Sequence, residues 1–249
     1  EDIHRIPKEG PFILISNHPY GGLEAVITLK LILDIRPDFK YLANFLLTRI
    51  EPLENYFLPV NPFESQKELK SSISGIKNAY KHLNDKGALA IFPAGEVSSY
   101  KISRRAVSDR EWQTGILKFI KSAKVPVLPV YYSGHNSILF NILGFMHPML
   151  RTIKLPSELF NKKGKTFGIR IGSPIAVNEQ DQYDDITEYG RFLRTKTYSL
   201  GSSLEDKNLW HFTSSKNQKE IIDPVPVDDI ENDIKQIDDE FQLFRFKNY

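Results

Sequence analysis

The chain has 249 residues, of which 41% are apolar, and no Cys. This fits one large α/β domain, or one domain with an appendage, and excludes wholesale disorder, a disulfide framework, a cysteine-ligated zinc site and a cysteine nucleophile. The net charge of +2 is unevenly distributed, because residues 100–175 hold 13 basic and three acidic side chains, whereas residues 176–249 hold nine basic and 16 acidic ones. The basic middle predicts either solvated surface charge or an anionic partner, namely a nucleic acid, a phosphorylated ligand or a membrane surface.

Short apolar runs alternate with helical patterns over most of the chain. Strands are predicted at residues 11–16, 41–44, 88–92, 125–132 and 167–171. Helices are predicted at residues 23–33, 66–84 and 112–123. This alternation indicates an α/β sandwich, in which functional loops follow the ends of strands.

The composition changes towards the C-terminus. We therefore divide the chain into a domain of residues 1–205 and a C-terminal extension of residues 206–249. In the extension, residues 224–227 are typical of a linker, and isoleucines recur over residues 230–237 on an acidic amphipathic helix. Since no run of about 18 apolar residues occurs, no membrane-spanning helix is predicted.

His18 lies in a glycine-rich turn directly after the first predicted strand, and Glu24 lies six residues further on. A carboxylate at this spacing can hydrogen-bond one imidazole nitrogen and leave the other to take a proton from a substrate hydroxyl. Gly21 and Gly22 remove side-chain bulk where a ligand would approach. The alternative is an ordinary loop histidine, with Glu24 merely favourable near a helix N-terminus.

A second loop of this kind, Phe92 to Ser98, reads Phe-Pro-Ala-Gly-Glu-Val-Ser and also follows a predicted strand. Together with Asn17 to Glu24, it resembles the two main motifs of the PlsC-like glycerolipid acyltransferases. The match is closest to the hemolysin-like branch, which includes lyso-ornithine-lipid and glycine-lipid O-acyltransferases. Residues 58–63 and 125–130 resemble the second and fourth motifs of the family, and the motifs occur in the family's order.

The resemblance implies a glycerol-3-phosphate acyltransferase-like αβα sandwich with a mixed central sheet. It also implies that His18 is the general base that deprotonates the hydroxyl of a lyso-lipid, which then attacks an acyl thioester. Glu24 would orient His18 and stabilise its imidazolium. The acyl donor would be acyl-CoA or acyl carrier protein, with no cofactor and no metal. Substrate contacts are expected from Asn17, Gly21, Gly22, Asn61, Pro93, Gly95, Glu96, Ser98, Lys101, Arg104 and Arg105.

The chain departs from the family pattern at several positions. Glu24 stands where the family has Asp, and Ala94 replaces the usual motif Glu. The second motif lacks the Arg that phosphate-acceptor members use, and Asn61 lies nearby instead. A lyso-aminolipid acceptor therefore fits better than lysophosphatidate. Because Glu24 is longer than Asp, a catalytically weakened membrane- or lipid-binding module is the alternative function.

Residues 138–146 form the most apolar stretch outside the expected core, and Arg151 and Lys154 follow them. They predict either a core helix or a shallow membrane-dipping element beside cations. With the basic middle, they favour a peripheral protein at the cytoplasmic face of the inner membrane over a nucleic-acid binder, for which no fold signature is present. Residues 224–249 resemble the connector that in this branch can precede a GNAT-like N-acyltransferase domain, so a fused or partner N-acyltransferase is a further expectation.

Overall fold

The computed structural model describes residues 2–44, 51–60, 69–101, 106–146, 148–162 and 166–202. The described residues divide into two compact units. The first contains the described residues up to 134 and those from 166 onwards, and the second contains residues 135–162. The predicted domain boundary at residue 205, the linker at 224–227 and the acidic helix at 230–237 lie outside the described residues.

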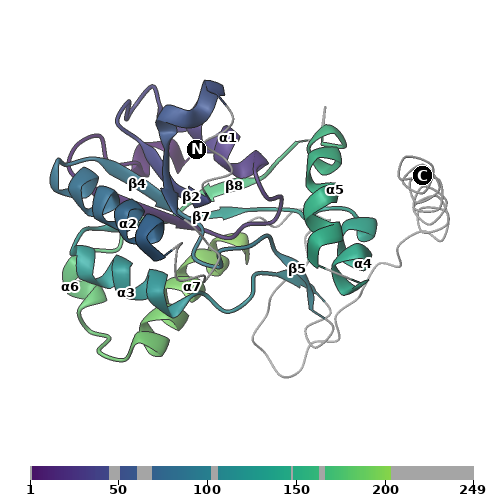
Figure 1. Ribbon diagram of the computed structural model, residues 1–249. Helices are drawn as coiled ribbons and strands as arrows, with labels where there is room; N and C mark the ends of the chain where they lie inside the picture. Colours follow the sequence, from purple (N-terminus) through teal and green to yellow (C-terminus); the bar gives the residue numbers. More distant parts are fainter. Residues whose placement is uncertain are drawn as a thin grey trace. The chain divides into compact units, whose positions relative to one another are not determined.

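The first unit is built on a six-stranded sheet with the strand order β3-β2-β4-β1-β7-β8 (Figure 1). The strands are β1 (Phe12–Ser16), β2 (Lys40–Asn44), β3 (Phe57–Val60), β4 (Ala88–Ile91), β7 (Val127–Tyr132) and β8 (Ile169–Ile171). All neighbouring strands are parallel except β7 and β8, which are antiparallel. The sheet is therefore mixed, as expected. Because β4 and β7 flank β1 in parallel, the loops that follow these three strands leave the same edge of the sheet.

Helices cover both faces of this sheet (Figure 1). The helices of the unit are α1 (Leu23–Ile32), α2 (Leu69–Asn84), α3 (Thr114–Ala123), α6 (Val177–Gln180) and α7 (Ile186–Ser202). Along β1, Ile13 and Ile15 face the core that α2, α3 and α7 close, whereas Phe12 and Leu14 face the core that α1 closes. This alternation places apolar side chains on both faces, which gives the αβα sandwich.

The predicted strands and helices are confirmed at their approximate positions, with two qualifications. The helix predicted at 112–123 begins at Thr114, because the backbone of the preceding Gln113 is extended, with a φ of −69° and a ψ of 125°. Residues 66–68 of the helix predicted at 66–84 lie outside the described residues. Several elements were not predicted from the sequence. They include the short 3₁₀ helices η1 (Asp2–Arg5) and η3 (Glu51–Tyr56), and the hairpin of β5 (Ser99–Lys101) and β6 (Ala106–Ser108). Strand β3 and helices α6 and α7 were not predicted either.

The second unit holds α4 (Ile138–Met146) and α5 (Pro148–Phe160). The buried carboxylate of Glu158 accepts the backbone N–H of Ser137 at 2.9 Å and the ammonium of Lys162 at 3.1 Å, so it ties α5 to the start of α4. Burial raises the pKa of Glu158, but the bonds from Ser137 and the charge of Lys162 outweigh it, and the pKa lies below its ordinary value. None of the helices in the described part of the chain is long and apolar enough to cross a bilayer.

Candidate active site

The loop after β1 is anchored by Asn17, whose side chain bonds the backbone at the end of β7. Its amide nitrogen donates to the carbonyl of Tyr132, its amide oxygen accepts the N–H of Tyr132, and both distances are 2.8 Å. Asn17 is 4% exposed, so it holds the loop rather than facing a ligand. The backbone at the next residue, His18, is therefore anchored at the edge of the sheet.

Glu24 lies in the first turn of α1 and folds back towards the N-terminus of its own helix. It is fully buried, and its carboxylate accepts the backbone N–H groups of Tyr20, Gly21 and Gly22. Gly21 has a φ of 94°, a conformation that favours glycine and that lets successive amides turn towards the carboxylate. The N-terminus of a helix also favours a negative charge, because its first N–H groups lack partners within the helix.

The imidazole of His18 lies beside this carboxylate. Its Nδ1 is buried 3.4 Å from Oε1 of Glu24 and forms no hydrogen bond among the described residues, so the two groups are in close contact without a formed hydrogen bond. Burial raises the pKa of Glu24, but the adjacent His18 and the backbone N–H of Tyr20 outweigh it, and the pKa is lowered from its ordinary value of 4.5. Glu24 is therefore ionised at neutral pH.

Aromatic stacking holds the plane of the His18 ring. The ring lies on Phe92, the first residue of the second motif, with centroids 3.9 Å apart and planes inclined by 22°. Phe92 in turn stacks on Tyr41 of β2 at 5.5 Å. The side chain of His18 is 12% exposed, and in the described residues no hydrogen bond engages its Nε2. One imidazole nitrogen thus faces a carboxylate, and the other is left for an external proton donor.

The two loops are joined by Asp109, which the sequence analysis did not single out. Its carboxylate accepts the backbone N–H of His18 and the hydroxyl of Ser98, and the backbone N–H of Ser98 donates to the carbonyl of His18 at 2.8 Å. Asp109 is 1% exposed, although it lies in the basic segment of the chain. The only signal for it in the sequence was a carboxylate in a mainly basic segment, three residues before a Trp.

The rest of the second motif forms a tight turn. The N–H of Gly95 donates to the carbonyl of Phe92 at 3.0 Å, and Gly95 has a φ of 70°. This positive φ favours glycine, and a Cβ atom here would also displace the end of the Gln113 side chain, whose Nε2 would be 2.0 Å away. Pro93 is buried beneath it. Glu96 points towards Arg110, with 3.7 Å between the carboxylate and the guanidinium, and both side chains are well exposed.

The structure brings five of the predicted site residues together on the loop after β1 and in the first turn of α1, namely Asn17, His18, Gly21, Gly22 and Glu24, and links them to Ser98. The ammonium of Lys101 donates to the hydroxyl of Ser99 within β5, and none of its described contacts reaches His18. Asn61, Arg104 and Arg105 lie outside the described residues. In the ranges that the structure describes, no group of three or more His, Asp or Glu side chains is arranged to hold a metal ion.

The chain resembles known proteins in both sequence and fold. A family model described as "Acyltransferase" matches residues 1–207. The chain is 30% identical over 207 residues to a lyso-glycine lipid O-acyltransferase of Bacteroides thetaiotaomicron, which covers 80% of this chain and 73% of that protein. It is 26% identical over 208 residues to a lyso-glycine lipid O-acyltransferase of Phocaeicola vulgatus, with 80% and 71% covered. The crystal structure of the 1-acyl-sn-glycerophosphate acyltransferase PlsC from Thermotoga maritima shares the fold, with a TM-score of 0.51 at 16% identity over 85% of this chain and 73% of that one.

Proposed function

Because residues 1–207 match its family model, the chain belongs to the acyltransferase family, and we propose that it transfers a fatty acyl group from a thioester to the hydroxyl of a lyso-lipid. The observation that carries this proposal is the His18–Glu24 contact at the carboxyl end of β1. It supplies a histidine with one nitrogen beside a buried anion and the other unengaged among the described residues. This arrangement suits a general base for a hydroxyl nucleophile.

In the proposed reaction, Nε2 of His18 takes the proton of the acceptor hydroxyl as its oxygen attacks the thioester carbonyl. The carbon–sulfur bond then breaks, an ester forms, and the imidazolium returns its proton to the leaving thiolate. Glu24 stabilises the imidazolium, because it is ionised and fully buried 3.4 Å from Nδ1. The donor is an acyl thioester of CoA or of acyl carrier protein.

The way in which the longer side chain of Glu24 is accommodated supports an active enzyme over a catalytically weakened lipid-binding module. The extra methylene, relative to the Asp of the family motif, is accommodated because the side chain folds back onto the amides of Tyr20, Gly21 and Gly22. The carboxylate still reaches His18. This placement of the carboxylate supports the proposal that Glu24 serves His18 as the shorter Asp would.

For the acceptor, we propose a lyso-aminolipid. Two relatives are named lyso-glycine lipid O-acyltransferases, and they match across about four-fifths of this chain. The lack of the phosphate-binding Arg in the second motif points in the same direction. Glu96 of the second motif forms an exposed ion pair with Arg110, which offers charged groups to a polar head group.

We also propose that the protein meets its acceptor at a membrane surface, with α5 as the contacting element. Leu139 and Phe140 of α4 are buried, whereas Ile153 and Phe160 of α5 are 63% and 77% exposed. These two residues are separated by seven positions, so they lie on one face of the helix. Lys154, which the sequence suggested as a cation for head groups, is only 5% exposed. Apolar side chains on α5 are thus better candidates than α4 for entering the interface.

The proposal is tested with the purified chain, acyl-CoA or acyl carrier protein thioesters, and a panel of lyso-lipids in mixed vesicles, with products identified by mass spectrometry. We expect acylation of lyso-glycine lipid at a higher kcat/KM than lysophosphatidate. Failure with every lyso-lipid and both donors would contradict the function. Phe160→Glu should reduce co-sedimentation with anionic vesicles, and unchanged vesicle binding in this variant would contradict the role of α5.

A further inference from the structure

Asp109 gathers three donors that come from three different parts of the first unit. One carboxylate oxygen, Oδ1, accepts the backbone N–H of His18 at 3.2 Å and the hydroxyl of Ser98 at 2.5 Å. The other oxygen, Oδ2, accepts the indole N–H of Trp112 at 3.2 Å. Since Asp109 is 1% exposed, these bonds replace its contact with water, and hydrogen bonds to a charged acceptor are stronger than those to a neutral one.

The peptide of His18 is held from both ends by this cluster. Its N–H donates to Asp109, and its carbonyl accepts the backbone N–H of Ser98 at 2.8 Å. The hydroxyl of Ser98 is at the same time bound to Asp109. The three residues therefore form a closed ring of hydrogen bonds, which fixes the backbone from which the imidazole extends. Stacking on Phe92 and the contact with Glu24 fix the imidazole itself.

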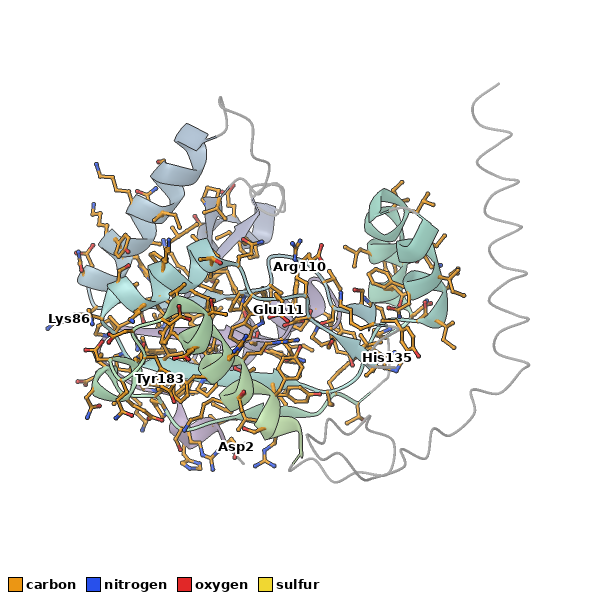
Figure 2. The ribbon with its side chains drawn as sticks, turned by 90° about the horizontal axis from the view of Figure 1, so that it is seen from below. Asp2, Lys86, Arg110, Glu111, His135 and Tyr183 are labelled. Atoms are coloured by element: carbon orange, nitrogen blue, oxygen red, sulfur yellow. The ribbon has the colours of Figure 1, made fainter. Side chains whose placement is uncertain are left out.

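Asp109 is also fixed from outside this ring, by α7. Its N–H donates to the hydroxyl of Tyr198 at 3.0 Å, and its carbonyl accepts the guanidinium of Arg194 at 3.0 Å. The two residues that follow it, Arg110 and Glu111, are labelled in Figure 2 in the segment between β6 and α3. Asp109 is thus held at both its backbone and its side chain, as a rigid support for His18 requires.

We propose that Asp109 is a positioning residue for acyl transfer, which sets the position of His18 directly and through Ser98. This inference rests on the proposed function with His18 as the general base. It also changes the role expected for Ser98. Its hydroxyl is committed to Asp109, its backbone N–H is bonded to the carbonyl of His18, and the residue is 3% exposed, so Ser98 acts on the reaction by holding His18 rather than by touching the substrate.

The test is a double-mutant cycle with Asp109→Asn and Ser98→Ala, in which kcat and KM are measured for the thioester and the lyso-lipid. Asn keeps the size of Asp, but it has one acceptor oxygen and an NH₂ group that opposes a donor. We expect Asp109→Asn to lower kcat about 10- to 100-fold with KM nearly unchanged, because a displaced base loses its geometry but not the substrate. Ser98→Ala should lower kcat about 3- to 10-fold, and it should have no further effect in the Asp109→Asn background.

Asp38→Asn is the matched control, since Asp38 also accepts a backbone N–H, that of Ala88 at 2.8 Å, and an Arg side chain, but at the opposite end of β4. It should lower the melting temperature without lowering kcat.

An Asp109→Asn variant with the kcat of Asp38→Asn, or losses that multiply in the double mutant, would overturn the positioning role. If Asp109→Asn does not fold, Ser98→Ala decides: a lower kcat at constant KM supports the role, and a raised KM at constant kcat overturns it. A parent chain that transfers no acyl group would overturn the proposed function itself, and this inference with it.

Discussion

Replacing Glu24 by Gln removes the charge beside His18 with little change in shape. At the observed 3.4 Å, two unit charges in a protein site with an effective permittivity of about 20 attract by about 5 kcal/mol. This is an upper limit, because the N–H groups of Tyr20, Gly21 and Gly22 share the charge of the carboxylate. Each 1.4 kcal/mol of lost imidazolium stabilisation lowers the rate about tenfold, so we expect kcat to fall by about 10²- to 10³-fold.

The assay is steady-state acyl transfer from a thioester to a lyso-lipid, together with thermal denaturation. The Gln side chain turns an NH₂ group towards a backbone N–H, which should cost about 1–3 kcal/mol of stability. Asp38→Asn again separates this loss of stability from the loss of rate. A Glu24→Gln variant with kcat within about threefold of the parent would refute the reasoning, because the attraction would then contribute nothing to the transition state. Glu24→Asp should also be slower, since the shorter side chain cannot reach both the amides and Nδ1; a gain of activity would favour the weakened-module alternative.

Two further predictions concern stability. Gly95→Ala should lower the free energy of unfolding by about 1–3 kcal/mol, because the position has a φ of 70° and the new Cβ would meet Gln113. Gly22→Ala, whose Cβ meets no atom within 4 Å, should cost less, about 0.5–1 kcal/mol, because Ala is a poorer N-cap of α1 than Gly; equal losses in the two variants would contradict this account. Because the pKa values of Glu24 and Glu158 are lowered from 4.5, both carboxylates stabilise the fold above that pH, and this contribution is lost as the pH falls through their folded values. The melting temperature of Glu158→Gln should therefore fall less than that of the parent between about pH 5 and pH 3. An equal or greater fall would contradict the lowered pKa of Glu158.

The layout of the sheet edge follows from patterns that are local in the sequence. The apolar runs that form β1 and β4 are short and bounded by turn residues, so their carboxyl ends and the loops that follow them could be predicted. His18 lies on one of these loops and Glu24 lies six residues further on, and a spacing this short limits their separation in any fold. The contact between His18 and Glu24 could therefore be predicted from the sequence.

The role of Asp109 could not be predicted, because the two partners that tie it to the site lie elsewhere in the chain. Ser98 is 11 residues away and His18 is 91 residues away, and a buried hydrogen-bond cluster has no periodicity that a sequence pattern reveals. In a segment with 13 basic residues, an acidic side chain resembles ordinary surface charge. The exposure of Phe160 and the burial of Lys154 were missed for a related reason: both depend on which face of α5 packs, and apolar content alone does not decide that.

The role of His18 as the general base is the central claim, and His18→Ala tests it most directly. The measurement is the rate at which a purified chain acylates lyso-glycine lipid from a thioester donor, with circular dichroism and vesicle binding as controls for the fold and for membrane contact. The account predicts a loss of at least about 100-fold in kcat with both controls retained. A variant that folds, binds vesicles and acylates the lyso-lipid at the parent's rate would contradict it.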